Sequence, residues 1–146
     1  MTREQERIRT LFDQLMSAPL KGFPNRYSRY KLEAPSEHGV YVIYGPRMKV
    51  LYVGRTYRGQ AYGGGFQDRG AGGGLQRRLI TQRQKIVGSK AGCKFRCLVV
   101  KKPRERALLE AYATGFLCPQ HIRLADTDVW MQRHAEFVSP AQKSAP

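Results

Sequence analysis

The stretch that decides the fold runs from Gly39 to Gly54 and reads GVYVIYGPRMKVLYVG. Its two apolar runs, VYVIY and VLYV, consist of β-branched and aromatic residues together with one leucine, types that are enriched in strands. A Gly-Pro pair separates the runs, as turn residues do. The pattern predicts a β-hairpin with a loop over residues 45–50, in which Tyr41 and Tyr52 lie on neighbouring strands and approach each other.

Hydrophobic periodicity predicts the remaining elements. Apolar residues recur at intervals of three and four over residues 2–16, which indicates a helix, and Thr2 with Gln5 resembles a capping box. Residues 75–86 predict a basic helix, and residues 94–100 predict a third, buried strand. A last helix begins at Pro103 and ends at Cys118, and Glu110 lies inside it, beside its apolar stripe.

A glycine-rich run separates the hairpin from the basic helix. Residues 59–74 contain eight glycines, together with Tyr62, Phe66 and Arg69. The run has little side chain to bury and a high backbone entropy, so we expect a loop, either one that orders on nucleic acid or a tolerated surface insertion. No Lys-Ser or Lys-Thr follows it, which excludes a phosphate-binding loop of the nucleotide-triphosphatase type.

Composition narrows the class of protein. The chain has 146 residues, 41% of them hydrophobic, which fits one globular domain. No run approaches the roughly 20 apolar residues of a membrane span, and no secretory segment follows the charged N-terminus, so we expect a cytoplasmic protein without a membrane partner. Three cysteines fit a reducing compartment, and those at 93 and 97 have too few other ligands nearby for zinc.

The net positive charge of the chain indicates that the protein binds a polyanion. Lys and Arg number 26 against 11 Asp and Glu, a net charge of +15 and a pI near 10.2. Such an excess is typical of nucleic-acid binders. It is densest between Arg77 and Arg106, where eleven basic residues accompany one acid, Glu105. The candidate DNA-binding residues are Arg58, Arg69, Arg77, Arg83, Lys85, Lys101 and Lys102.

The order of these elements and their motifs resembles the GIY-YIG nuclease family over residues 38–122. The name motifs appear as Gly39-Val40-Tyr41 and Tyr52-Val53-Gly54, and the basic helix carries Leu-Gln-Arg-Arg-Leu at residues 75–79. The resemblance implies an α+β fold, a small three-stranded antiparallel sheet flanked by helices. The glycine-rich insertion and the strand over residues 94–100 are most similar to the restriction endonucleases of the family.

The resemblance also implies a site. It makes Arg78 the catalytic arginine and Glu110 the single metal-binding glutamate, holding Mg²⁺ (or Mn²⁺ as a substitute) against the scissile phosphate. Arg55 is a second positive group, on the phosphate or on a tyrosine. Tyr41 or Tyr52 then takes or orients the proton of the attacking water, because nearby cations favour the phenolate.

Three positions need separate comment. Many relatives carry His or Tyr one turn after the arginine, where this chain has Gln82. Many also carry Asn after the proline that closes the glutamate helix, whereas Pro119 precedes Gln120 and His121 here, and His121 could take that place. His38 directly precedes the first motif; it could lie near the reaction centre, but the preferred interpretation is an ordinary loop histidine.

The sequence therefore predicts a Mg²⁺-dependent DNA endonuclease of the restriction or repair type. The alternative is a catalytically inactive nucleic-acid-binding module on the same scaffold; a basic ribosomal-type RNA protein would not need Glu110. A restriction role favours a homodimer, since two-fold symmetry suits a palindrome. We expect an N-terminal helix and lead-in over residues 1–37, the nuclease domain over 38–122 and an extension over 123–146.

Overall fold

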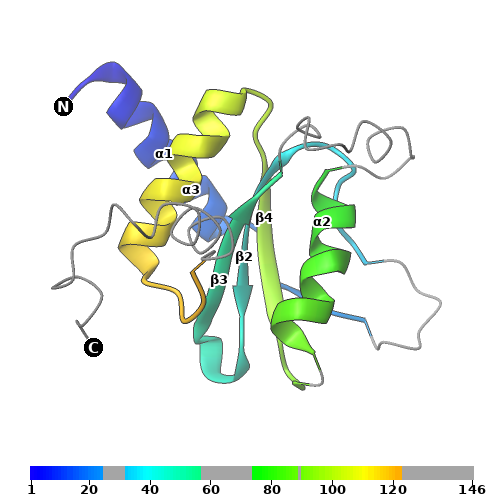
Figure 1. Ribbon diagram of the computed structural model, residues 1–146. Helices are drawn as coiled ribbons and strands as arrows, with labels where there is room; N and C mark the ends of the chain where they lie inside the picture. Colours follow the sequence, from blue (N-terminus) through cyan, green and yellow to red (C-terminus); the bar gives the residue numbers. More distant parts are fainter. Residues whose placement is uncertain (25–31, 57–73, 89, 123–146) are drawn as a thin grey trace, which may run out of the picture.

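The computed structural model describes residues 1–24, 32–56, 74–88 and 90–122, which form an α+β fold (Figure 1). Its helices in this part of the chain are α1 (Arg3–Ser17), α2 (Leu75–Gln82) and α3 (Pro103–Leu117). Its strands are β1 (Lys21–Gly22), β2 (Gly39–Tyr44), β3 (Val50–Arg55) and β4 (Lys94–Val99). A short 3₁₀ turn, η1 (Pro46–Met48), joins β2 to β3, as expected for the hairpin loop.

The strands form a single antiparallel sheet in the order β1-β4-β2-β3. The predicted hairpin is present, with Tyr41 opposite Gly54 and Ile43 opposite Tyr52. The prediction of three strands is wrong, because β1 adds a fourth beside β4. That strand has two residues, Lys21 and Gly22, too few to give the alternating pattern by which a strand is found in a sequence.

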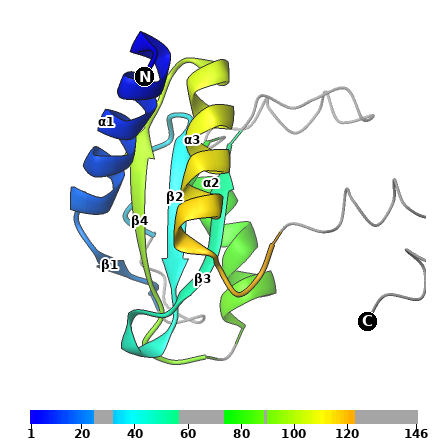
Figure 2. The same cartoon turned by 90° about the vertical axis from the view of Figure 1, so that its left-hand side faces the viewer.

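Helices cover both faces of the sheet. In Figures 1 and 2, α1 and α3 lie side by side on one face and α2 lies on the other. Successive residues of β2 point to opposite faces, so Val40 and Val42 join the core with α1 and α3, whereas Tyr41 and Ile43 join the core with α2. All six residues of β2 are buried, as expected for a central strand covered on both faces.

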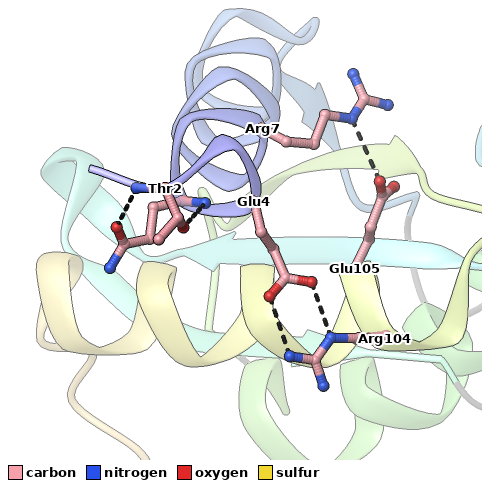
Figure 3. Close-up of polar contacts among 6 residues, drawn as sticks. Thr2, Glu4, Arg7, Arg104 and Glu105 are labelled. Carbon is pink, nitrogen blue, oxygen red and sulfur yellow. Dashed lines mark hydrogen bonds and ion pairs between the residues drawn. The ribbon is translucent and has the colours of Figure 1, made fainter.

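The ends of the helices follow from local chemistry. The capping box predicted for α1 is present, since Thr2 accepts from the amide of Gln5 and the Gln5 side chain accepts from the amide of Thr2 (Figure 3). The predicted basic helix continues past α2 as one π-helical turn, η3 (Arg83–Val87). Helix α3 begins at Pro103, as predicted, and ends where Cys118 adopts a left-handed conformation.

Several predictions fall on residues outside the described ranges. They concern the basic and aromatic lead-in at 25–31, the glycine-rich run apart from Gly74, and the extension from residue 123. The candidate DNA-binding residues Arg58 and Arg69 also lie outside the described ranges. Among the helices that the structure describes, none is both long enough and apolar enough to cross a membrane.

Candidate functional site

The two motif tyrosines lie together on the α2 face of the sheet. Their ring centroids are 6.1 Å apart with an interplanar angle of 37°. Tyr41 is fully buried and Tyr52 is nearly so, and both belong to the core that α2 covers. The hairpin thus brings the two phenols into contact, as the sequence predicts.

Gly54 explains why the second motif ends in glycine. It lies opposite Tyr41 on β3, and a Cβ added to it would overlap the Tyr41 hydroxyl and lie 2.8 Å from Cε1 of Tyr52. The hydroxyl of Tyr41 therefore crosses the backbone of β3 at a position where only glycine leaves room. Gly39 is constrained in a similar way, because a Cβ there would overlap the carbonyl oxygen of Leu98.

Arg78 lies on α2, in the same layer as the tyrosines. Leu75 and Leu79 bury one face of the helix against Tyr41 and Tyr52. The side chain of Arg78 is half-buried, and its Nε exposes less than 1 Å². Gln82, one turn further on, is only 4% exposed and lies on the core-facing side of α2. A histidine or tyrosine at this position would therefore also face the core.

Glu110 and Arg55 meet on the other face of the sheet. Arg55 Nε lies 3.4 Å from Glu110 Oε1, and the side chains are 33% and 25% exposed. The second carboxylate oxygen, Oε2, exposes less than 1 Å². Residues two apart in a strand point to the same face, so Arg55 points the same way as Val53, toward α3. The sequence predicted a phosphate or a tyrosine as the partner of Arg55; the structure pairs it with the glutamate.

The predicted catalytic residues thus form two groups around the end of β3. Tyr41, Tyr52 and Arg78 lie on the α2 face, and Arg55 and Glu110 lie on the α3 face. β3 is an edge strand of the described sheet, so no further strand of this part of the chain separates the two groups at that edge. Gly54, which has no side chain, lies between them. The Tyr41 hydroxyl, Arg78 Nε and Glu110 Oε2 each expose less than 1 Å².

Two buried polar residues at this end of the sheet were missed in the sequence. Thr56 is 3% exposed, and its hydroxyl binds the amide of Gly39 and the ring of His38. Arg106 is 4% exposed, and its Nη1 donates to the carbonyls of Val100 and Lys101 at 2.9 and 2.8 Å. Neither residue gave a signal in the sequence, because Arg106 directly follows two other charged residues, Arg104 and Glu105, in the first turn of α3.

The predicted DNA-binding residues divide by exposure. Arg77 and Lys85 are exposed on α2 and η3, and Lys101 and Lys102 are exposed between β4 and α3. Arg83 is half-buried and donates through Nη1 to the carbonyl of Pro24 at 3.2 Å, a contact that holds the end of α2 to the preceding segment. His121 lies at the other end of the edge strand, where its amide donates to the carbonyl of Leu51.

A metal site built by protein side chains alone is absent from the described residues. No group of three or more His, Cys, Asp or Glu lies together there. Glu110 is a single carboxylate, already next to one cation, the Arg55 guanidinium. Mg²⁺ commonly keeps most of its water and binds one or two carboxylates plus phosphate oxygens, so the carboxylate of Glu110 fits this metal when a phosphate completes the site.

Cys93 and Cys97 pack in the core that α2 covers. Burial raises the pKa of the Cys93 thiol and that of the Cys97 thiol above the ordinary value, because it disfavours the charged thiolate. The thiolate is the form that attacks substrates and binds zinc. Both residues are therefore assigned to packing.

No family model matches the chain, and a search of the curated proteins finds no match.

Proposed function

We propose that this protein is a metal-dependent DNA endonuclease of the GIY-YIG type. One observation carries the proposal: Glu110 and Arg55 are paired beside Gly54, over which the hydroxyl of Tyr41 lies. These four residues come from three separated parts of the sequence and gather around the end of β3, with the ion pair on the α3 face of the sheet and the phenol on the α2 face. The resemblance of the motifs to the family assigns a catalytic role to each except Gly54.

Phosphodiester hydrolysis requires an activated water, a neutralised phosphoryl group and a stabilised leaving oxygen. Glu110 would hold Mg²⁺, or Mn²⁺ in its place, and such a metal would supply positive charge to the phosphate and to the leaving 3′ oxygen. Arg78 braces the phosphoryl oxygens with its planar guanidinium group. Arg55 neutralises Glu110 in the free protein and contacts a phosphate oxygen in the complex with DNA.

We propose that Tyr41, rather than Tyr52, accepts the proton of the attacking water. The hydroxyl of Tyr41 lies over Gly54, the residue that precedes Arg55 in β3, and it is buried in the free protein, so a water reaches it only when the site rearranges around DNA. Tyr52 lies against it and fixes the orientation of its ring. A net charge of +15 supports DNA as the polyanion that the site meets.

A second candidate, an inactive nucleic-acid-binding module, has one observation in its favour. The carboxylate of Glu110 is already neutralised by Arg55, as a structural ion pair would be. The buried Gln82 also stands where many relatives of the proposed family carry a histidine or tyrosine. The two candidates differ in whether the Glu110 carboxylate is needed for a reaction.

The experiment is supercoiled plasmid incubated with the purified protein in Mg²⁺ or in EDTA, beside the variant Glu110→Ala. Nicked or linear DNA that requires Mg²⁺ and disappears with Glu110→Ala supports the endonuclease. DNA that is bound but uncut with Mg²⁺ and with Mn²⁺, and equally well by Glu110→Ala, supports the binding module instead. Branched and mismatched duplexes are included as substrates, so that an intact duplex is not the only structure tested.

A further inference from the structure

The turn between β2 and β3 carries a basic group that the proposed mechanism does not use. Its residues Arg47, Met48 and Lys49, here called the hairpin tip, are all exposed. Neither Arg47 nor Lys49 forms an ion pair or a side-chain hydrogen bond with any residue that the structure describes. Two cations are thus presented to solvent at one end of the edge strand.

The backbone of the hairpin tip adopts a conformation that its residues do not favour. Arg47 has φ 61° and ψ 28°, and Met48 has φ 60°, so both residues are left-handed. The amide of Gly45 donates to the carbonyl of Lys49 at 2.7 Å across the turn. Two consecutive residues with positive φ are typical of the tight hairpin turn for which Asn-Gly is the favoured sequence.

The chain therefore gives up stability at this turn. An Asn-Gly pair would form the same turn without the close approach of Cβ to the following carbonyl oxygen, because glycine has no Cβ and asparagine tolerates the left-handed region. Residues in sparsely populated conformations cluster where their side chains have a function. The geometry of the turn does not explain Arg47, whereas a contact with a partner outside the protein does.

The hairpin tip and the candidate site lie at opposite ends of β3. The strand runs from Val50, which directly follows Lys49, to Arg55, and five steps along an extended strand span about 17 Å. In Figures 1 and 2 the turn between β2 and β3 lies at one end of the sheet and the connection from β4 to α3 at the other. The phosphates of one DNA strand follow each other at about 3.4 Å along the axis, so about five nucleotides cover the same length.

The edge strand between these two places presents no acidic side chain of its own. Neither β3 nor the segment over residues 119–122 contains Asp or Glu. The amides of Gln120 and His121 in that segment donate to the carbonyls of Val50 and Leu51 at 3.0 and 2.8 Å, which holds the segment against the edge. A polyanion that lies along β3 therefore meets a cation at each end of the strand.

We propose that the hairpin tip is a second DNA contact, at which Arg47 and Lys49 bind backbone phosphates about five nucleotides from the phosphate at Arg55. The inference rests on the proposed function, because it takes DNA as the substrate of the site. Phosphate contacts fix the position of a duplex and carry no base specificity. The tip thus aligns the DNA with the edge strand.

Variants of the turn separate a DNA contact from a role in folding. Arg47→Asn together with Met48→Gly installs the favoured turn and removes one cation, whereas Met48→Gly alone keeps both cations. Lys49→Gln removes the other cation, and Arg9→Gln, at an exposed position of α1, is the control for net charge. Dissociation constants for a short labelled duplex are measured in EDTA at several salt concentrations, and melting temperatures are recorded without DNA.

We expect the double variant to melt a few degrees higher than the wild type and to bind the duplex about threefold more weakly, the size of one exposed ion pair. Lys49→Gln should bind about threefold more weakly at an unchanged melting temperature. Each lost phosphate contact should lower the slope of log K against log salt by about 0.9. Met48→Gly and Arg9→Gln should keep the affinity and the slope of the wild type.

Wild-type affinity and salt slope in the double variant would overturn the proposal. A loss of the same size in Arg9→Gln would also overturn it, by tracing the effect to net charge, and so would a double variant that melts lower than the wild type, since Arg47 and Met48 would then serve the turn. A wild-type protein that does not bind the duplex would overturn both the contact and the proposed function. Because binding is measured without metal, a protein that binds DNA through the tip but cuts none would keep this contact and lose the nuclease activity.

Discussion

Helix α3 carries two glutamates, each paired with an arginine, and the two pairs differ in their surroundings rather than in their geometry. Arg7 Nε lies 3.3 Å from Glu105 Oε1, and Arg55 Nε lies 3.4 Å from Glu110 Oε1. The carboxylates are similarly shielded, with side chains 18% and 25% exposed. Distance and burial therefore do not decide which glutamate has a function.

The partners of the two glutamates do distinguish them. Glu105 pairs with α1, and the neighbouring pair of Arg104 with Glu4 also joins the two helices (Figure 3). Glu110 instead reaches the end of an edge strand, next to the glycine over which the Tyr41 hydroxyl lies. An ion pair between two helices is thus sufficiently explained by packing. An ion pair at the end of an edge strand, directly after a glycine that admits no side chain, is a candidate for chemistry.

The largest expected effect comes from filling the space at Gly54. In Gly54→Ala the new methyl group overlaps the Tyr41 hydroxyl, and we expect a loss of about 1–3 kcal/mol in the free energy of unfolding from overpacking. Because the phenol is also displaced, cleavage should fall about 100-fold in the same variant. Denaturant unfolding and plasmid cleavage measure the two effects.

The matched control is Gly115→Ala on α3, where an added Cβ meets no atom within 4 Å. We expect this variant to be equally active and slightly more stable, since alanine favours a helix. Normal cleavage by a folded Gly54→Ala would mean that the position of the Tyr41 hydroxyl is unimportant for the reaction.

A smaller effect is expected from removing the hydroxyl of either of two buried tyrosines of β2, and it should distinguish their roles. In Tyr41→Phe we expect cleavage to fall about 100-fold, the range for loss of a proton-transferring group, with little change in stability. Tyr44 is buried on the other face, and its hydroxyl accepts from Arg96 Nη1 at 3.1 Å. Tyr44→Phe should lose about 1 kcal/mol of stability and keep its activity.

Single-turnover cleavage and thermal melting of both variants test this contrast. Equal activity of the two phenylalanine variants would remove Tyr41 from the proposed mechanism and leave it as a core residue.

The smallest expected effect concerns the ion pairs between α1 and α3. The Arg104 guanidinium lowers the pKa of the Glu4 carboxyl below its ordinary value of 4.5. A carboxyl whose pKa is lowered in the folded state stabilises the fold above its unfolded pKa, and this contribution is lost as the pH falls through the folded value. Melting temperatures of wild type and Glu4→Gln should therefore differ slightly at neutral pH and converge as the pH falls below the lowered pKa of the Glu4 carboxyl.

In this last case cleavage measured at neutral pH should be unchanged, since the pair lies on the α1–α3 surface. A Glu4→Gln variant with normal stability and impaired cleavage would reverse the distinction between the two kinds of pair.

Local patterns predicted much of the fold. The capping box at Thr2, the hairpin with its tyrosines and the proline start of α3 depend on residues close together in the chain, and the structure contains all three. The two-residue strand β1 was missed, because its pairing with β4 joins segments more than seventy residues apart and leaves no local pattern.

The residues of the candidate site could be proposed from the sequence, but their arrangement in space could not. The family resemblance singled out Arg55 and Glu110. Their pairing depends on which face of β3 packs against α3, and this contact joins residues that are 55 positions apart in the sequence. Thr56 could not be found for the same reason: its hydroxyl acts on Gly39 and His38, seventeen and eighteen residues earlier.

The central claim is that Glu110 serves a reaction and Glu105 serves packing. The direct test is single-turnover cleavage of a duplex in Mg²⁺ by wild type, Glu110→Gln and Glu105→Gln, since each substitution removes one carboxylate charge from the same helix at nearly constant shape. We predict a loss of about 100-fold or more for Glu110→Gln with DNA binding retained, and a change below about twofold for Glu105→Gln. Equal rates for the two variants would contradict the claim.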